Sequence, residues 1–118
     1  MFEQAREIFE DQLTRVQNEV WGSLIGVIHC LLLPCCAAMN DWDAFDLHLK
    51  AASKAYQGSQ ESESDAATSA HEGATIAATA GKRDRARLGF DLAKMLWMRL
   101  GRDEAVEIVD RALLGLDT

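Results

Sequence analysis

The stretch from Ala80 to Ala105, AGKRDRARLGFDLAKMLWMRLGRDEA, decides the fold class of this chain. It contains Gly81 and Gly101, each of which ends an apolar run and is followed by charged residues that open the next one. Glycine readily adopts the left-handed backbone conformation that closes a helix, and an aspartate placed just after it can cap the following helix. The two glycines therefore predict tight turns between consecutive helices.

A third break of the same kind lies at Asn40, where the sequence reads NDWDA, and a fourth lies in QGSQ at residues 57–60. Chain breaks thus recur about every 20 residues, a spacing that suits one helix plus one short turn and makes neighbouring helices antiparallel. We predict an all-α fold of about six helices, at residues 2–18, 21–39, 42–56, 62–80, 83–100 and 103–115.

Composition agrees with a single helical domain over residues 1–118, because proline occurs only once and alanine is frequent. The first predicted helix has an apolar stripe at three- and four-residue steps, as expected of a half-exposed packing helix. Segment 62–80 has small side chains almost throughout. Small side chains bury little apolar area, so this segment is predicted to be the least stable helix.

The uncharged run from Val20 to Asn40, VWGSLIGVIHCLLLPCCAAMN, is long enough to cross a membrane. Acidic residues flank it at Glu19 and Asp41, and no basic neighbour would orient its insertion. We therefore favour a helix buried inside the protein, with a membrane span as the alternative. Pro34 removes a backbone donor and is expected to bend or break this helix.

Soft metal ligands also occur in this run, at His29, Cys30, Cys35 and Cys36. Adjacent helical residues point about 100 degrees apart, and no Cys-x-x-Cys motif is present, so we interpret the cysteines as packing residues and predict no metal site and no cofactor. Their odd number and the absence of a signal peptide indicate a cytoplasmic protein.

Catalytic motifs are not recognisable. His48 and His71 are isolated in the sequence, although a partner distant in sequence stays open. The formal net charge of -7 argues against nucleic-acid binding. We predict that the protein is not an enzyme.

The basic cluster of the chain is Lys82, Arg83, Arg85 and Arg87, at the start of a predicted helix where the helix dipole disfavours cations. Asp84 and Asp91 are the simplest balancing charges. Alternatively, the cluster binds an anionic peptide or the acidic first half of another copy. We name these four residues as interaction candidates, together with Trp42 at a predicted turn.

Five residues at characteristic spacing, Ala74, Gly81, Ala86, Phe90 and Ala93, resemble the tetratricopeptide repeat, in which small and aromatic side chains interlock two antiparallel helices. A weaker copy follows around Gly101, and a fainter one around Asn40. The resemblance implies a short α-solenoid that binds protein or peptide partners, with possible homodimerisation through helix 2–18 or 103–115.

More loosely, LLLPCCAAMNDWDAFDLHLKAA at residues 31–52 resembles the C-terminal helical-repeat regions of large bacterial signalling proteins that carry a serine/threonine kinase and an ATPase module. The kinase motifs themselves are absent. This resemblance implies a non-catalytic scaffold or regulatory portion of a longer protein. From the net charge and the acidic flanks of the uncharged run, we predict no nucleic-acid partner and no membrane partner. The alternative function is a helical sensor domain for a small molecule or a metal.

Overall fold

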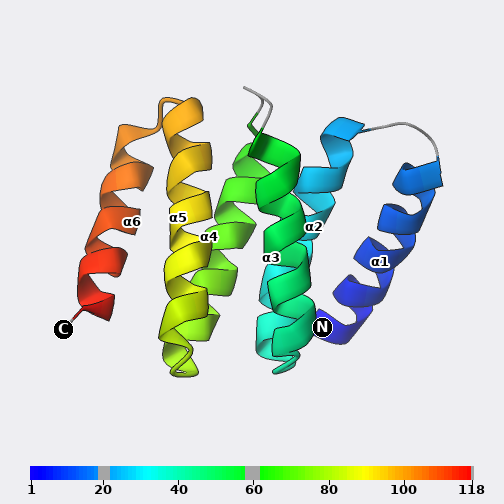
Figure 1. Cartoon of the computed structure of the whole chain (residues 1–118), viewed down its shortest axis with the longest axis horizontal. Coiled ribbons are helices and arrows are strands. Elements are labelled where there is room, and N and C mark those ends of the chain that lie inside the picture. The colour runs from blue at the N-terminus through cyan, green and yellow to red at the C-terminus, as the bar shows by residue number, and fades with distance from the viewer. Residues whose placement is uncertain (19–21, 58–61, 118) are drawn as a thin grey trace.

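The computed structural model describes residues 1–18, 22–57 and 62–117. This part of the chain is all helical, without strands, and every helix boundary lies within two residues of its predicted position. The prediction of an all-α fold with about six helices is therefore confirmed. The break expected at QGSQ falls mostly on residues 58–61, which lie outside the described residues. The helices in Figure 1 are α1 (Phe2–Asn18), α2 (Gly22–Ala38), α3 (Trp42–Gln57), α4 (Ser64–Thr79), α5 (Arg83–Arg99) and α6 (Asp103–Leu116).

The three breaks that define the helical pattern form the same turn. Asn40, Gly81 and Gly101 adopt positive φ angles of 58°, 79° and 70°. At the second turn, the backbone N–H of Lys82 donates a 2.9 Å hydrogen bond to the carbonyl of Ala77, and equivalent bonds close the other two turns. These bonds satisfy carbonyls that the end of a helix leaves unpaired. The left-handed turns are therefore confirmed at the predicted residues.

Aspartate capping is confirmed at one of the three turns. Asp41 accepts a hydrogen bond of 3.2 Å from the backbone N–H three residues later. At the other turns the cap residues are Lys82 and Arg102, neither of which makes a side-chain cap bond. Asp84 and Asp103 instead lie inside the first turn of α5 and of α6, where their negative charges interact favourably with the helix dipole without capping the helix.

We predict that Gly81→Ala destabilises the protein by about 1 kcal/mol, because a β-carbon at positive φ meets the chain's own backbone. An added Cβ would touch nothing else within 4 Å, so the loss isolates the backbone conformation. Gly81→Asn is the matched control, since asparagine tolerates this conformation and already occupies the first turn. Urea unfolding measures both variants, and an equal loss for the two would contradict this reasoning.

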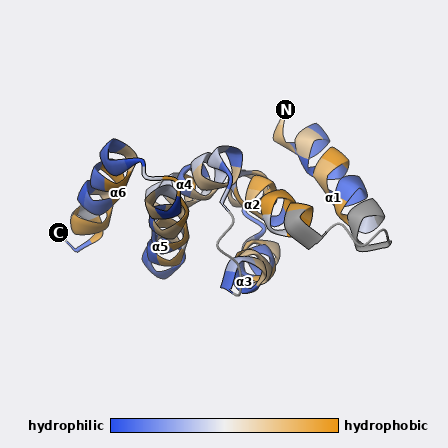
Figure 2. Ribbon diagram, turned by 90° about the horizontal axis from the view of Figure 1, so that it is seen from above, coloured by the Kyte–Doolittle hydropathy of each residue, from blue (hydrophilic) through white to orange (hydrophobic). Residues whose placement is uncertain are grey.

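Helix α4 lies at the centre of the packing, between α2 and α5, as Figure 2 shows from above. Helix α2 also packs against α1 and α3, while α6 packs against α5. Helices α3 and α5 project to the same side of α2 and α4 (Figure 2). The arrangement contains two successive helix pairs, α2 with α3 and α4 with α5, joined through their α2–α4 contact.

Small side chains explain the central position of α4. An added Cβ on its Gly73 would lie 2.9 Å from the Cβ of Leu33 on α2, and one on Gly89 of α5 would lie 2.9 Å from the Cβ of Ala74. Such distances mean that the helices approach closely at both faces. The small side chains of α4 bury little area each, but they allow both α2 and α5 to pack closely against it. The low stability expected for this helix stays a prediction.

Helix α2 occupies most of the uncharged run and is a buried helix, as favoured from its sequence. Leu32, Leu33 and Cys36 are each 0 % exposed. Within the described ranges, no helix combines the length and apolarity that a membrane crossing requires. Of the bend or break predicted at Pro34, the break does not occur, because α2 continues through Pro34 to Ala38. Packing against three neighbouring helices holds a segment that a missing hydrogen bond would otherwise weaken.

Candidate functional site

A groove of about 1000 Å³ lies between α3 and α5. The α3 side extends from Asp46 to Gln57, and the α5 side extends from Asp84 to Met95. Each side therefore spans about three helical turns, or roughly 16 Å at 1.5 Å per residue. The site is an elongated trough between two helices that share few contacts.

Apolar side chains from both helices line the middle of the groove. Leu49 of α3 and Leu92 of α5 are buried, at 5 % and 4 % exposure, whereas Leu88 is 56 % exposed. Leu88, Leu92 and Met95 follow the four- and three-residue steps that place side chains on one helix face. That spacing is a sequence signal that could have located one wall. The pairing of this wall with α3 required the structure.

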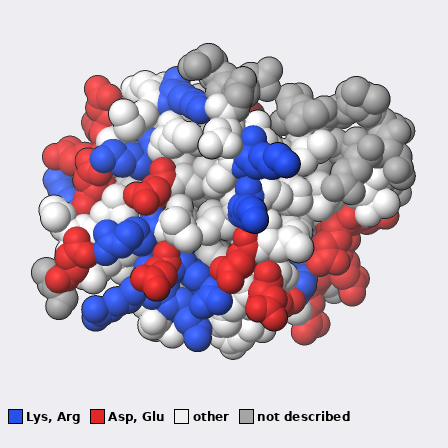
Figure 3. Space-filling model, viewed as in Figure 1, with Lys and Arg blue, Asp and Glu red and all other residues white. Residues whose placement is uncertain are grey.

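Charged side chains border this apolar strip. Arg85 of α5 donates two hydrogen bonds to the Asp46 carboxylate of α3, at 2.8 and 3.0 Å, and so bridges the groove at one end. Farther along, Lys50 and Lys54 lie on the α3 wall, and Asp91 lies on the α5 wall. Figure 3 shows basic side chains over the upper part of α3 and acidic ones at its lower end, mixed charges over α5 and uncharged surface between the two helices.

Three of the five candidate interaction residues meet beside the bridged end of the groove. The Lys82 Nζ lies 5.9 Å from the centroid of the Trp42 ring, and the Arg85 guanidinium carbon lies 5.8 Å from it. Both are cation–π contacts. The half-buried Trp42 ring also packs edge-on against the Phe45 ring, with 5.5 Å between the ring centroids. The structure thus gathers these three candidates on one side of α3 and α5.

The other two candidates are separate from this group. Arg83 is exposed at the start of α5, and Arg87 pairs with Asp117 beyond the end of α6. The hydrogen-bonded partners of Arg85 and Arg87 are Asp46 of α3 and Asp117, whereas the expected neighbour Asp84 acts on Arg85 through its charge. Asp84 and Arg85 are adjacent residues on one helix and do not face each other, whereas neighbouring helices can supply a carboxylate that does.

A second polar site is a buried pair of histidines between α2 and α3. The Nδ1 atoms of His29 and His48 are 2.8 Å apart, and the residues are 5 % and 8 % exposed. One Nδ1 must carry the proton that the other accepts. His29 lies 11 residues before Asn40 and His48 lies 8 residues after it. In an antiparallel helix pair, residues at comparable sequence distances before and after the turn lie near the same height along the two helices. This spacing is the sequence signal that could have revealed the partner left open for His48.

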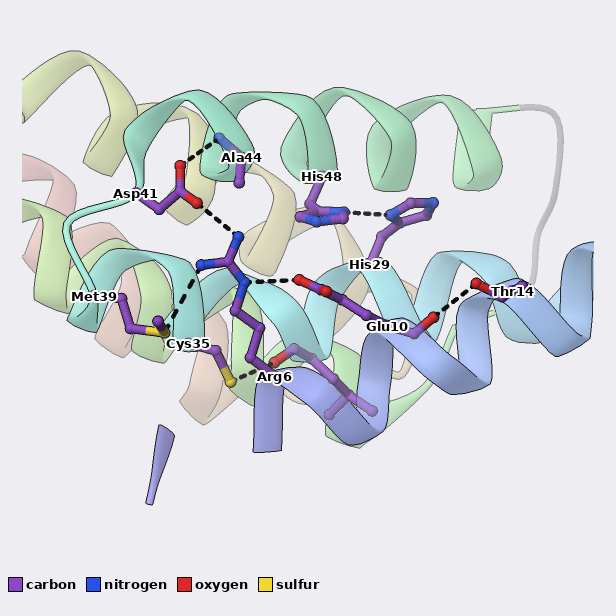
Figure 4. Close-up of polar contacts among 10 residues, drawn as sticks. Arg6, Glu10, Thr14, His29, Cys35, Met39, Asp41, Ala44 and His48 are labelled. Atoms are coloured by element: carbon purple, nitrogen blue, oxygen red, sulfur yellow. Dashed lines mark hydrogen bonds and ion pairs between the residues drawn. The ribbon is translucent and has the colours of Figure 1, made fainter. Parts of the chain in front are cut away.

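Charged residues of α1 and the first turn lie beside the histidine pair, as Figure 4 shows. Arg6 of α1 pairs with Glu10 of the same helix at 2.7 Å and joins α1 to that turn through a contact of 2.6 Å to Asp41. Burial, with a smaller contribution from the nearby His48, lowers the pKa of His29 to about 4. Burial also lowers the pKa of His48. Both imidazoles are therefore neutral at neutral pH.

The cysteines are buried thiols. Burial raises the pKa of Cys30 to about 12 and that of Cys36 to about 11, and it also raises the pKa of Cys35. A protonated thiol is a poor nucleophile and a poor metal ligand. In the three described segments, no group of three or more His, Cys, Asp or Glu side chains is placed to hold a metal ion.

Comparison with known proteins gave no match to a protein-family model, a curated protein or a solved structure. The candidate site is therefore defined by its own geometry. Its elements are the apolar groove with charged walls, the aromatic–cationic cluster at one end and the histidine pair on the other side of α3.

Proposed function

We propose that this chain is a non-catalytic protein-interaction module that takes up a helical segment of a partner in the groove between α3 and α5. The observation that carries this proposal is the elongated apolar trough itself. Leu88 exposes more than half of its side chain there although its neighbour Leu92 is buried. Contiguous exposed apolar surface bordered by polar residues is typical of binding sites, and an amphipathic helix is the usual occupant of such a groove.

We further propose that the helices form a short tetratricopeptide-like solenoid. The support is the recurrence of the same left-handed turn at Asn40 and Gly81, each inside a tightly packed helix pair. In such a stack each pair contacts its neighbours, and binding surfaces form along one side. The proposed setting is a bacterial cytoplasmic signalling protein, in which this module is a scaffold or regulatory portion.

Self-association is a second part of the proposal. Helices α1 and α6 lie at opposite ends of the stack in Figure 1. They expose Ile8 at 57 %, Ile108 at 55 % and Leu114 at 68 %. Terminal units of a solenoid leave apolar surface that a second copy can cover. A clean monomer in sedimentation at high protein concentration would contradict homodimerisation through α1 or α6.

The test of the docking groove is a selection from a displayed library of helical peptides. We predict that Leu88→Glu weakens binding of the selected peptides at least about tenfold, because a carboxylate then occupies the apolar strip that the partner must cover. Fluorescence anisotropy with labelled peptides measures the loss. The exposed position of Leu88 leaves the fold intact, which circular dichroism checks.

Leu47→Glu is the matched control. Leu47 lies on α3, the other helix that forms the groove, and is exposed like Leu88, at 61 %, but it does not line the groove. Peptides that bind the groove should bind this variant as they bind the unaltered protein. A library that yields no binders, or only binders indifferent to Leu88→Glu, would show that the groove is not the docking site.

A further inference from the structure

The charges that border the groove are sorted by sign between its two walls. Among the described residues, the hydrogen-bonded ion pair that crosses the groove is Asp46 with Arg85. The remaining charges are Lys50 and Lys54 on α3 and Asp84 and Asp91 on α5. The α3 wall is thus positive and the α5 wall is negative. An occupant between them meets opposite potentials on its two flanks.

The spacing along each wall is helical. Lys50 and Lys54 are four residues apart on one face of α3, and both are exposed. Carboxylates one turn apart on a helical ligand would match this row. Asp84 and Asp91 are seven residues apart on α5, or two turns, and both are also exposed. Basic side chains of the same ligand would lie along this second row.

We propose that the occupant is an amphipathic helix with an apolar stripe, a row of acidic residues on the flank that faces Lys50 and Lys54, and basic residues on the flank that faces Asp84 and Asp91. This inference rests on the proposed docking function. It adds the chemical character of the partner, which charge complementarity determines. A uniformly acidic ligand would be repelled by the α5 wall, and a uniformly basic one by the α3 wall.

The charge arrangement requires a specific set of probes. Exchanging the acidic and basic flanks of a helix is equivalent to laying it in the groove in the opposite direction, so a flank-exchanged peptide is no control. The informative probes are three synthetic helical peptides with one apolar stripe. The first has one acidic and one basic flank, the second has two acidic flanks, and the third has two basic flanks. Circular dichroism matches their helicity.

We predict that the peptide with one acidic and one basic flank binds most tightly and that its affinity falls about tenfold or more for Lys50→Glu/Lys54→Glu. In this variant both walls are acidic, so the peptide with two basic flanks should become the preferred ligand. Fluorescence anisotropy at low and high salt measures each affinity, and the preference should weaken with salt. Arg102→Glu/Arg111→Glu, which changes the net charge equally at exposed positions outside the groove, should retain the original preference.

The outcomes separate this inference from the function on which it rests. Binding that is lost in Leu88→Glu and reverses its charge preference in the double lysine variant supports both. Binding that is lost in Leu88→Glu but ignores the charge arrangement overturns the sorted-charge inference and leaves the docking groove standing. If no library peptide and none of the three designed peptides responds to Leu88→Glu, the docking function fails, and this inference fails with it.

Discussion

Acidification from about pH 7 to about pH 4 is expected to remove roughly 3 kcal/mol from the free energy of unfolding. The cause is the buried pair of His29 and His48, which makes a 2.8 Å contact between α2 and α3. Folding lowers the pKa of His29 from 6.5 to about 4. Between these values the unfolded chain binds a proton that the folded chain excludes, so stability is complete above pH 6.5 and declines as the pH falls toward 4.

The charged residues around the histidine pair do not reverse the lowering of its pKa values. Glu10 and Asp41 favour the protonated form of His48 and Arg6 opposes it, while burial is the largest influence and lowers its pKa. If both imidazoles were protonated, two positive charges would face each other across the pair, and this repulsion also disfavours protonation of the second histidine. The lowered pKa of Asp41 would cause an acid loss too, but only in the lower range where carboxylates titrate.

The double substitution His29→Leu/His48→Leu should flatten the decline of stability between about pH 6.5 and pH 5, because both polar partners are replaced by apolar groups of similar size. His48→Leu alone should be less stable than the double variant at neutral pH, since it leaves His29 buried without its hydrogen-bond partner. Urea unfolding at a series of pH values measures each curve. His71→Gln is measured alongside, since burial also lowers the pKa of His71, which packs on Phe90 away from the pair, and this variant gives the separate contribution of His71 to the decline. A double variant that keeps the full pH dependence would show that other groups cause it.

Gly73→Ala is the second change with a large expected effect, a loss of about 2 kcal/mol even though alanine favours helices by about 1 kcal/mol over glycine. Its new Cβ would lie 2.9 Å from the Cβ of Leu33, 3.1 Å from the Leu33 carbonyl carbon and 3.2 Å from the backbone nitrogen of Pro34. Two of these three atoms are backbone and cannot rotate away. Helices α2 and α4 must therefore separate at the centre of the core.

Gly115→Ala in α6 is the matched control, because an added Cβ there meets nothing within 4 Å. This variant should gain up to about 1 kcal/mol from helix propensity. Thermal and urea unfolding of the two variants measure the difference directly. Equal stabilisation by both alanines would show that α2 and α4 are not packed at the distance described.

The helical fold could be predicted because the residues that end its helices act through local backbone conformation. Asn40, Gly81 and Gly101 tolerate positive φ through their own chemistry, so their effect does not depend on which helices they join. Apolar periodicity between these turns then predicts helices. The break that was one of two outcomes predicted at Pro34 does not occur, because packing against neighbouring helices keeps α2 continuous. Prediction was wrong for two caps, because the turn geometry leaves Asp84 and Asp103 inside the helix.

The candidate site could be predicted only in part. Trp42, Lys82 and Arg85 were selected individually by residue type and position, but their meeting beside the groove depends on the packing of α3 near α5. The carboxylates that pair with Arg85 and Arg87 are 39 and 30 residues away in the chain. No local pattern indicates such partners. The likeness to tetratricopeptide repeats, the interaction function and the bacterial signalling context stay proposals.

The amino-acid sequence by itself determined where the helices begin and end, since backbone conformation and amphipathic periodicity depend on residues within a few positions of each other. Tertiary structure alone decided which helix faces meet. It placed the small residues of α4 between two neighbours, joined His29 to His48 and left the groove open between α3 and α5. The physical reason is that these contacts depend on the distance and orientation between whole helices, which no short stretch of sequence specifies.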